Sequence, residues 1–141
     1  MSKYSSTLII SVMTMLLSGV SAHAATNNNG RWVEIGVTPD RTSFDVDATS
    51  IRVDGKNVVF WMRQIYLDGP RDLGGPKKTA VLLAKMEVAC DQQNSRYLAS
   101  MSYDETGAAS VDDEGISEWA PIAPESNFET VARKVCAANG L

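Results

Sequence analysis

Histidine is almost absent from this sequence: the only one, His23, lies in the tripeptide Ala22-His23-Ala24. The tripeptide follows an apolar run and has the small-residue pattern of a signal-peptidase site. If that run is removed as a signal peptide, the mature chain contains no histidine. Serine–histidine and cysteine–histidine nucleophile pairs, and the histidine-containing zinc sites of hydrolases, are then excluded.

The N-terminus has each part of a secretory signal. Lys3 provides a positive start, residues 8–20 form the apolar run, and small residues precede Ala25. A retained membrane anchor is the alternative, but the run is shorter than the ~20 residues that span a bilayer. We therefore expect residues 1–24 to be a signal peptide cleaved after Ala24, and residues 25–30 to be a flexible N-terminus. No cysteine lies directly after the run, where a lipoprotein is acylated, so we expect an exported protein, periplasmic or secreted to the cell surface, that is not a lipoprotein.

Positive charge is also scarce, with 13 Lys and Arg against 17 Asp and Glu and a formal net charge of −4. Loss of Lys3 with the signal makes the mature chain one charge more negative. Nucleic-acid binding requires a basic face, so we expect no nucleic-acid partner. The densest acidic cluster, Asp112-Asp113-Glu114, lacks the ligand spacing and the glycine turn of a calcium loop. We predict no metal ion and no cofactor.

Only two cysteines are present, Cys90 and Cys136, and they do not form a CxxC motif. An exported protein with an even number of cysteines usually pairs them. A redox-active or metal-binding thiol pair is the alternative. We predict a structural Cys90–Cys136 disulfide.

Apolar residues alternate with polar ones along most of the mature chain, which is the pattern of half-buried strands. Asp54-Gly55 between two such runs indicates a tight hairpin. In the expected strand 43–47, Phe44 and Val46 point inward, and the carboxylates of Asp45 and Asp47 point outward. The expected strands are residues 31–37, 43–47, 51–53, 57–67, 79–90 and 96–103, with short edge strands near 110–111 and 116–119.

The C-terminal segment changes to a helical period. Ser126 and Glu129 have the spacing of a capping box, and Asn139-Gly140 has the composition of a helix C-cap. Cys136 belongs to the apolar stripe of this helix, whereas Cys90 lies on the inner face of a strand. The sequence therefore predicts an α+β fold: an antiparallel sheet of about six strands with one C-terminal helix packed on it and stapled by a disulfide.

The segment 68–78 is rich in glycine and proline and is expected to be a long exposed loop. It contains the only concentrated positive charge, on Arg71, Lys77 and Lys78. A solvated loop is the simplest interpretation, and capture of an acidic partner is the functional one. Alternation along the strand 96–103 places Tyr97, Ala99, Met101 and Tyr103 on one face and Leu98, Ser100 and Ser102 on the other. Tyr97 and Tyr103 either pack across strands or form a recognition patch.

The order of several short motifs resembles the surface-adhesin protein E family, small exported proteins of Gram-negative bacteria. The motifs span nearly the whole mature chain. They are Trp32 with Ile35-Gly36, Asp47-Ala48-Thr49-Ser50-Ile51, Val59-Phe60-Trp61, Lys85 with Glu87-Val88-Ala89-Cys90, Trp119 with Ile122-Ala123-Pro124-Glu125-Ser126, and Val135-Cys136.

This resemblance implies an antiparallel sheet with a disulfide-tied C-terminal helix, and an adhesin that binds host extracellular-matrix or plasma proteins. The namesake adhesin is a lipoprotein, whereas this chain has no cysteine that could be acylated after its apolar run. A soluble periplasmic structural or inhibitory module that binds an envelope protein is therefore the alternative function.

Taken together, residues 31–141 are expected to form one adhesin E-like domain with no catalytic residues. The predicted function is non-enzymatic binding of a protein partner through Arg71, Lys77, Lys78, Tyr97 and Tyr103. A hydrolase built on a carboxylate pair such as Asp45 and Asp47 is the less favoured alternative, because it requires a cleft and a raised pKa. An exposed edge strand would also allow a homodimer.

Overall fold

The computed structural model describes residues 30–112 and 115–141. The predicted signal peptide with His23, residues 25–29 of the predicted flexible N-terminus, and Asp113 and Glu114 of the acidic cluster lie outside the described residues. Within the described ranges, no helix has both the length and the hydropathy required to span a membrane.

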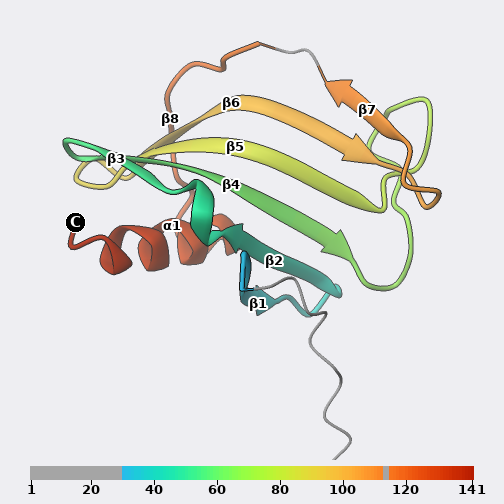
Figure 1. The fold of residues 1–141 in the computed structure, drawn as a ribbon, viewed down its shortest axis with the longest axis horizontal. Coiled ribbons are helices and arrows are strands. Elements are labelled where there is room, and N and C mark those ends of the chain that lie inside the picture. Colours follow the sequence, from blue (N-terminus) through green and yellow to red (C-terminus); the bar gives the residue numbers. More distant parts are fainter. Residues whose placement is uncertain (1–29, 113–114) are drawn as a thin grey trace, which may run out of the picture.

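One antiparallel sheet organises the described part of the chain (Figure 1). Its strands are β1 (Trp32–Val37), β2 (Thr42–Asp47), β3 (Arg52–Asp54), β4 (Asn57–Tyr66), β5 (Val81–Ala89), β6 (Asn94–Tyr103), β7 (Ala109–Asp112) and β8 (Ala120–Pro121). The order across the sheet is β1-β2-β4-β5-β6-β7, with β3 paired to the start of β4 and β8 to the start of β6. The prediction of about six antiparallel strands is confirmed.

The hairpin between β3 and β4 follows from one glycine. Asp54 pairs with Asn57, and Gly55 between them has a φ of 59°, a value that glycine adopts without steric cost. In the structure Asp54 is the last residue of β3 and only Gly55 takes the left-handed conformation.

Helix α1 (Asn127–Ala138) is capped at both ends. The Ser126 hydroxyl accepts from the Glu129 amide, as predicted, but the Glu129 carboxylate accepts from the amide of Glu125, one residue earlier than a capping box requires. Glu125 has a positive φ, 60°, which changes the direction of the chain just before the helix. At the other end Gly140 and Leu141 donate to Ala137 and Cys136, so the helix ends in a Schellman motif.

The hydrophobic core lies between α1 and the inner face of β2, β4 and β5. Its members alternate along the strands and recur at helical spacing on α1. They are Val46, Val58, Phe60, Met62, Ala84, Met86, Val88, Val131, Ala132, Val135 and Cys136. The Cys90–Cys136 disulfide, with a Cα–Cα distance of 5.9 Å, joins the end of β5 to the helix at the edge of this core. The predicted staple is confirmed.

Two β-bulges alter the predicted faces. In β1 the register shifts between Glu34 and Gly36, so the strict alternation predicted for residues 31–37 is interrupted. In β6, Tyr97 pairs with Met86 and Ala99 with Lys85, which leaves Leu98 as the extra residue. Residues directly opposite one another share a face. Tyr97 therefore lies on the inner face, and Ala99, Met101 and Tyr103 on the outer face, contrary to the predicted common face.

Two further predictions need correction. The last short strand lies at Ala120–Pro121 instead of 116–119, because only these residues pair with the start of β6. Asp45 and Asp47 lie on the outer face, but their exposed fractions are only 6% and 0%. Arginine side chains cover both carboxylates, so a position that points away from the core is not an exposed one.

Candidate functional site

The 68–79 loop leaves the sheet at the end opposite to the C-terminus of α1 (Figure 1). Arg71 and Thr79 exchange two backbone hydrogen bonds of 2.8 and 2.7 Å, which close the loop at its base. The segment 72–78 between them is exposed throughout. The segment is therefore an exposed loop, as its glycines and prolines predicted. The Arg71–Thr79 backbone pair that closes its base had no signal in the sequence.

Side-chain contacts of Arg71 also hold the base of the loop in place. Its guanidinium pairs with Asp40 at 2.8 Å and with Asp68 at 3.4 Å, and it stacks over the Tyr66 ring at 4.7 Å. A hydrogen bond from Thr38, followed in size by one from Arg71, lowers the pKa of Asp40 to about 2. The hydrogen bond with Asp40 in turn raises the pKa of Arg71. The Arg71 guanidinium is thus occupied by intramolecular ion pairs.

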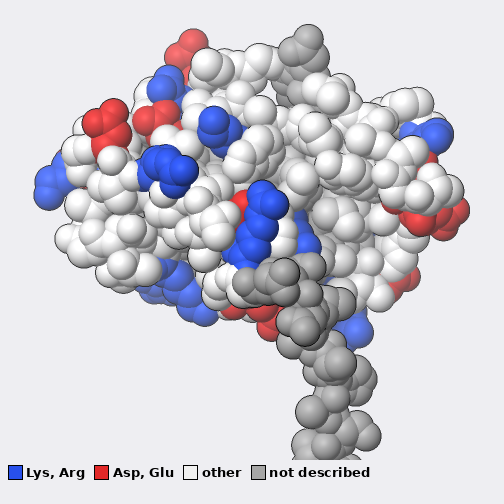
Figure 2. All heavy atoms as spheres, in the orientation of Figure 1, with Lys and Arg blue, Asp and Glu red and all other residues white. Residues whose placement is uncertain are grey.

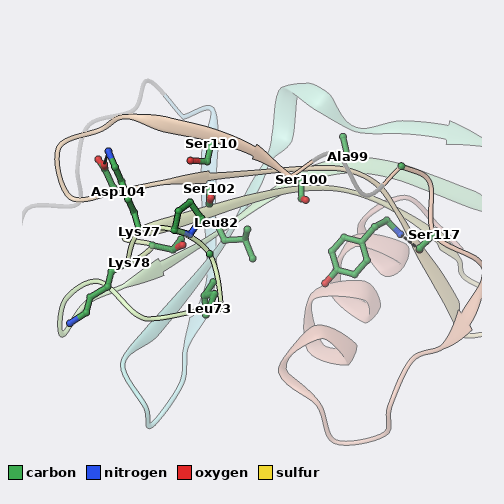
Figure 3. Close-up of a pocket in the computed structure, with 16 residues that line it drawn as sticks. Leu73, Lys77, Lys78, Leu82, Ala99, Ser100, Ser102, Asp104, Ser110 and Ser117 are labelled. Atoms are coloured by element: carbon green, nitrogen blue, oxygen red, sulfur yellow. Dashed lines mark hydrogen bonds and ion pairs between the residues drawn. The ribbon is translucent and has the colours of Figure 1, made fainter.

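A hollow of about 430 Å³ lies between the loop and the inner face of β5, β6 and β7, in the part that α1 does not reach. Ser110 pairs with Ser102 across β7 and β6, and Ser102 pairs with Leu82 across β6 and β5. Figure 3 shows Ser110, Ser102 and Ser100 along one wall. The hollow is therefore lined by hydroxyl groups, in contrast to the apolar core beside it.

Two of the predicted cations line the hollow. Lys77 pairs with Asp104 at 3.0 Å, and Figure 3 shows the two side chains together at one end. Hydrogen bonds from Thr106, then from Lys77, hold the pKa of Asp104 well below its ordinary value. Lys78 has no ion pair or hydrogen bond with any described residue, and its side chain extends away from the serines (Figure 3).

The two predicted tyrosines are separated. Tyr97 lines the hollow and is 46% exposed. Tyr103 lies on the outer face, where its hydroxyl donates to the Met101 sulfur at 2.9 Å. The structure thus gathers Lys77, Lys78 and Tyr97 around one hollow and places Arg71 and Tyr103 elsewhere.

Sequence reasoning missed the serine row and Asp104. The alternation of Ser100 and Ser102 was visible, but serine is common on solvated strands and signals no site by itself. The bulge that turns Tyr97 toward these serines has no sequence signature. Within the described ranges, no cluster of three or more potential metal ligands is found.

The sequence matches the family model described as surface-adhesin protein E over residues 32–137. No match was found among curated proteins. Crystal form II of Haemophilus influenzae protein E is similar in structure, with a TM-score of 0.63 and 16% identity over 83% of this chain and 95% of that chain. Protein E from non-typeable Haemophilus influenzae gives a TM-score of 0.57 at 16% identity, over 82% of each chain.

At this identity the structural likeness shows a shared fold. The family match extends from the first residue of β1 almost to the end of α1 and includes both cysteines of the disulfide. The chain belongs to the surface-adhesin protein E family.

Proposed function

We propose that this chain is a non-enzymatic, exported binding protein, and that the hollow, Lys78 and Tyr97 contact a protein partner. The observation that carries the proposal is the hollow itself: an open, hydroxyl-lined recess beside a half-exposed tyrosine and a lysine that pairs with no described residue. Tyrosine is enriched at the centres of interfaces, and a serine row offers donors and acceptors to a partner's backbone.

The closed base of the loop supports the same function. A loop already held by two backbone hydrogen bonds and by Arg71 loses less conformational entropy when a partner orders it. Family membership implies an exported protein and supports a surface adhesin. Host extracellular-matrix or plasma proteins are accordingly the proposed partners.

The buried aspartates favour binding over hydrolysis. A general acid of a glycosidase needs a raised pKa. Burial raises the pKa of Asp47, but the hydrogen bonds from Arg31 and Thr49 outweigh it, and the net pKa lies below the ordinary value. Asp45 is paired with Arg63 at 2.7 Å. Both carboxylates thus neutralise arginines.

Binding to immobilised extracellular-matrix and plasma proteins tests the proposal. We expect the double variant Lys78→Ser/Tyr97→Ser to bind about tenfold more weakly, the loss expected when a central contact is removed. Val53→Ser/Lys56→Ser, at the far hairpin, is the matched control and should bind like the wild type. Equal binding by all three proteins would refute the assignment of the hollow.

Localisation separates the surface adhesin from the periplasmic alternative. Protease treatment of intact cells should digest a surface adhesin, whereas a periplasmic module becomes accessible only after the outer membrane is opened. Confinement to the periplasm would favour an envelope protein as the partner. Mass spectrometry of the exported chain tests cleavage after Ala24 and the absence of a lipid.

A further inference from the structure

The outer face of the sheet carries three buried carboxylates, each covered by an arginine. Asp47, Asp45 and Glu87 have exposed fractions of 0%, 6% and 9%. Their guanidinium partners are Arg31, Arg63 and Arg96, each with a nitrogen–oxygen distance of 2.7 Å. The negative charge of this face is therefore buried, and the positive charge lies above it.

Tryptophan rings hold these arginines in place. Arg63 and Arg31 lie over the Trp32 ring at 4.6 and 5.7 Å, and Arg96 lies over the Trp119 ring at 4.7 Å. Each arginine is thus fixed both by a carboxylate and by an indole, which reduces the entropy that it loses when it binds a ligand.

Two of the three guanidinium groups retain free donors. Arg31 and Arg96 each direct Nε and Nη2 at a single carboxylate oxygen. In the part of the chain that the structure describes, Nη1 of either arginine makes no hydrogen bond. The Arg31 and Arg96 side chains are 59% and 32% exposed. Donors for a further carboxylate remain at both ends of the row.

Lys85 lies between these ends. It pairs across the sheet with Trp61 on one side and with Ala99 on the other. Among the described residues its ammonium group has no ion-pair partner, and Lys85 is partly exposed. Figure 2 shows separate Lys and Arg side chains over the middle of the visible face, with little Asp or Glu between them.

Strand order sets the length of the row. Trp32, on β1, and Arg96, on β6, are separated by β2, β4 and β5. Four strand spacings of about 4.8 Å place the two ends about 19 Å apart, which about six residues of extended chain can span. Trp61 and the partly buried Leu83 and Met101 line the row with apolar surface.

We propose that this row, Arg31, Lys85 and Arg96 with Trp61 between them, binds an extended acidic segment of a protein partner. Its carboxylates pair with the three cations, and its apolar side chains contact Trp61. A polypeptide fits better than a sulfated glycan, because apolar surface at Trp61, Leu83 and Met101 lies beside the cations and can contact apolar side chains. The surface is on the opposite face from the hollow and acts independently of it.

The test uses a labelled peptide of alternating glutamate and leucine, with a glutamine–leucine peptide as the uncharged control. Two-dimensional NMR of the ¹⁵N-labelled mature protein should show the Trp61 and Trp119 indole signals shifting with the acidic peptide only. We expect Lys85→Gln to weaken binding about fivefold and Lys85→Glu more. The control variant Arg133→Gln removes one exposed positive charge from α1, on the opposite face, and should leave binding unchanged.

The Lys85 ammonium group has no ion-pair partner in the described ranges, so its variants should fold, and the dispersion of the NMR spectrum verifies this. The proposal is overturned if both peptides shift the indole signals equally, or if Arg133→Gln weakens binding as much as Lys85→Gln. It is also overturned if heparin shifts the indole signals and the acidic peptide does not. Weakening of the peptide complex by added salt supports it.

Discussion

The inner face of the sheet has two unlike halves that share strand β5: β2 and β4 complete the half under α1, and β6 and β7 complete the half beside the 68–79 loop. Under α1, Phe60, Met86 and Val88 are almost completely buried. Beyond the helix, Leu82, Ser100 and Ser102 face the hollow and the 68–79 loop. Along β5 the inner face changes from the buried Met86 to the partly exposed Leu82, and the hydroxyl groups of the hollow come from β6 and β7.

The comparison shows how a small domain divides its tasks. The helix half contains the core and the disulfide, so it stabilises the fold. The loop half is held by hydrogen bonds and by the Arg71 ion pairs with Asp40 and Asp68, and the side chains of Tyr97 and Lys78 are exposed there. If this division is correct, changes in the two halves should have different effects.

The largest effect is expected from removal of the disulfide. Cys90→Ser/Cys136→Ser opens a link across 46 positions, and the chain-entropy estimate gives a loss of about 4 kcal/mol in the free energy of unfolding. Urea denaturation followed by circular dichroism measures it. An unchanged midpoint would mean that the helix half does not depend on its staple.

A matched pair on β5 compares the two halves directly. Met86→Ala removes a side chain that is 2% exposed and should cost about 3 kcal/mol. Leu82→Ala, four residues earlier on the same face, removes a partly exposed side chain and should cost about 1 kcal/mol. The same denaturation assay compares them, and equal losses would contradict the division.

Introducing a larger side chain into each half should give a smaller difference in stability. Ala84 is 2% exposed under the core, so Ala84→Leu should destabilise the protein by about 2 kcal/mol through strain. Ser102→Leu enters the hollow and should change stability by less than about 0.5 kcal/mol. Thermal denaturation measures both variants. A comparable loss in Ser102→Leu would show that the hollow is closely packed.

The smallest effect is local and depends on pH. Asp40 has a pKa lowered to about 2. A carboxyl with a lowered folded pKa stabilises the fold fully above its unfolded pKa of ~3.9, and this contribution is lost as the pH falls toward the folded value. Between pH 4 and 2 the amide signals of Arg71 and Thr79 should shift while that of Val135 does not. Simultaneous changes in all three would indicate global unfolding instead.

Much of the architecture could be predicted from the sequence because it depends on local patterns. Alternation gave β2, β4 and β5 to within a few residues, and Ser126 identified the start of α1. Two exported cysteines on apolar faces were sufficient to predict the staple. The loop was evident from its glycines and prolines, although its Arg71–Thr79 bridge was not.

The candidate site was predicted only in part, because it depends on distant residues. The β6 bulge, which separates Tyr97 from Tyr103, arises from pairing with β5 and leaves no mark in the alternation. Arg71 had the charge of a binding residue, but Asp40, in a turn thirty-one positions earlier, engages it. Asp45 and Asp47 were correctly assigned to the outer face, yet only Arg63 and Arg31 determine that they are buried.

The sequence by itself determined the sheet, the helix and the disulfide, because periodicity and the pairing of two cysteines act through neighbouring residues and a single link. Tertiary structure decided which part of the inner face α1 covers. It therefore decided which inner-face residues form the core and which line the hollow. It also decided which cations are engaged and which are free, because an ion pair depends on the distance between atoms and not on their separation in the sequence.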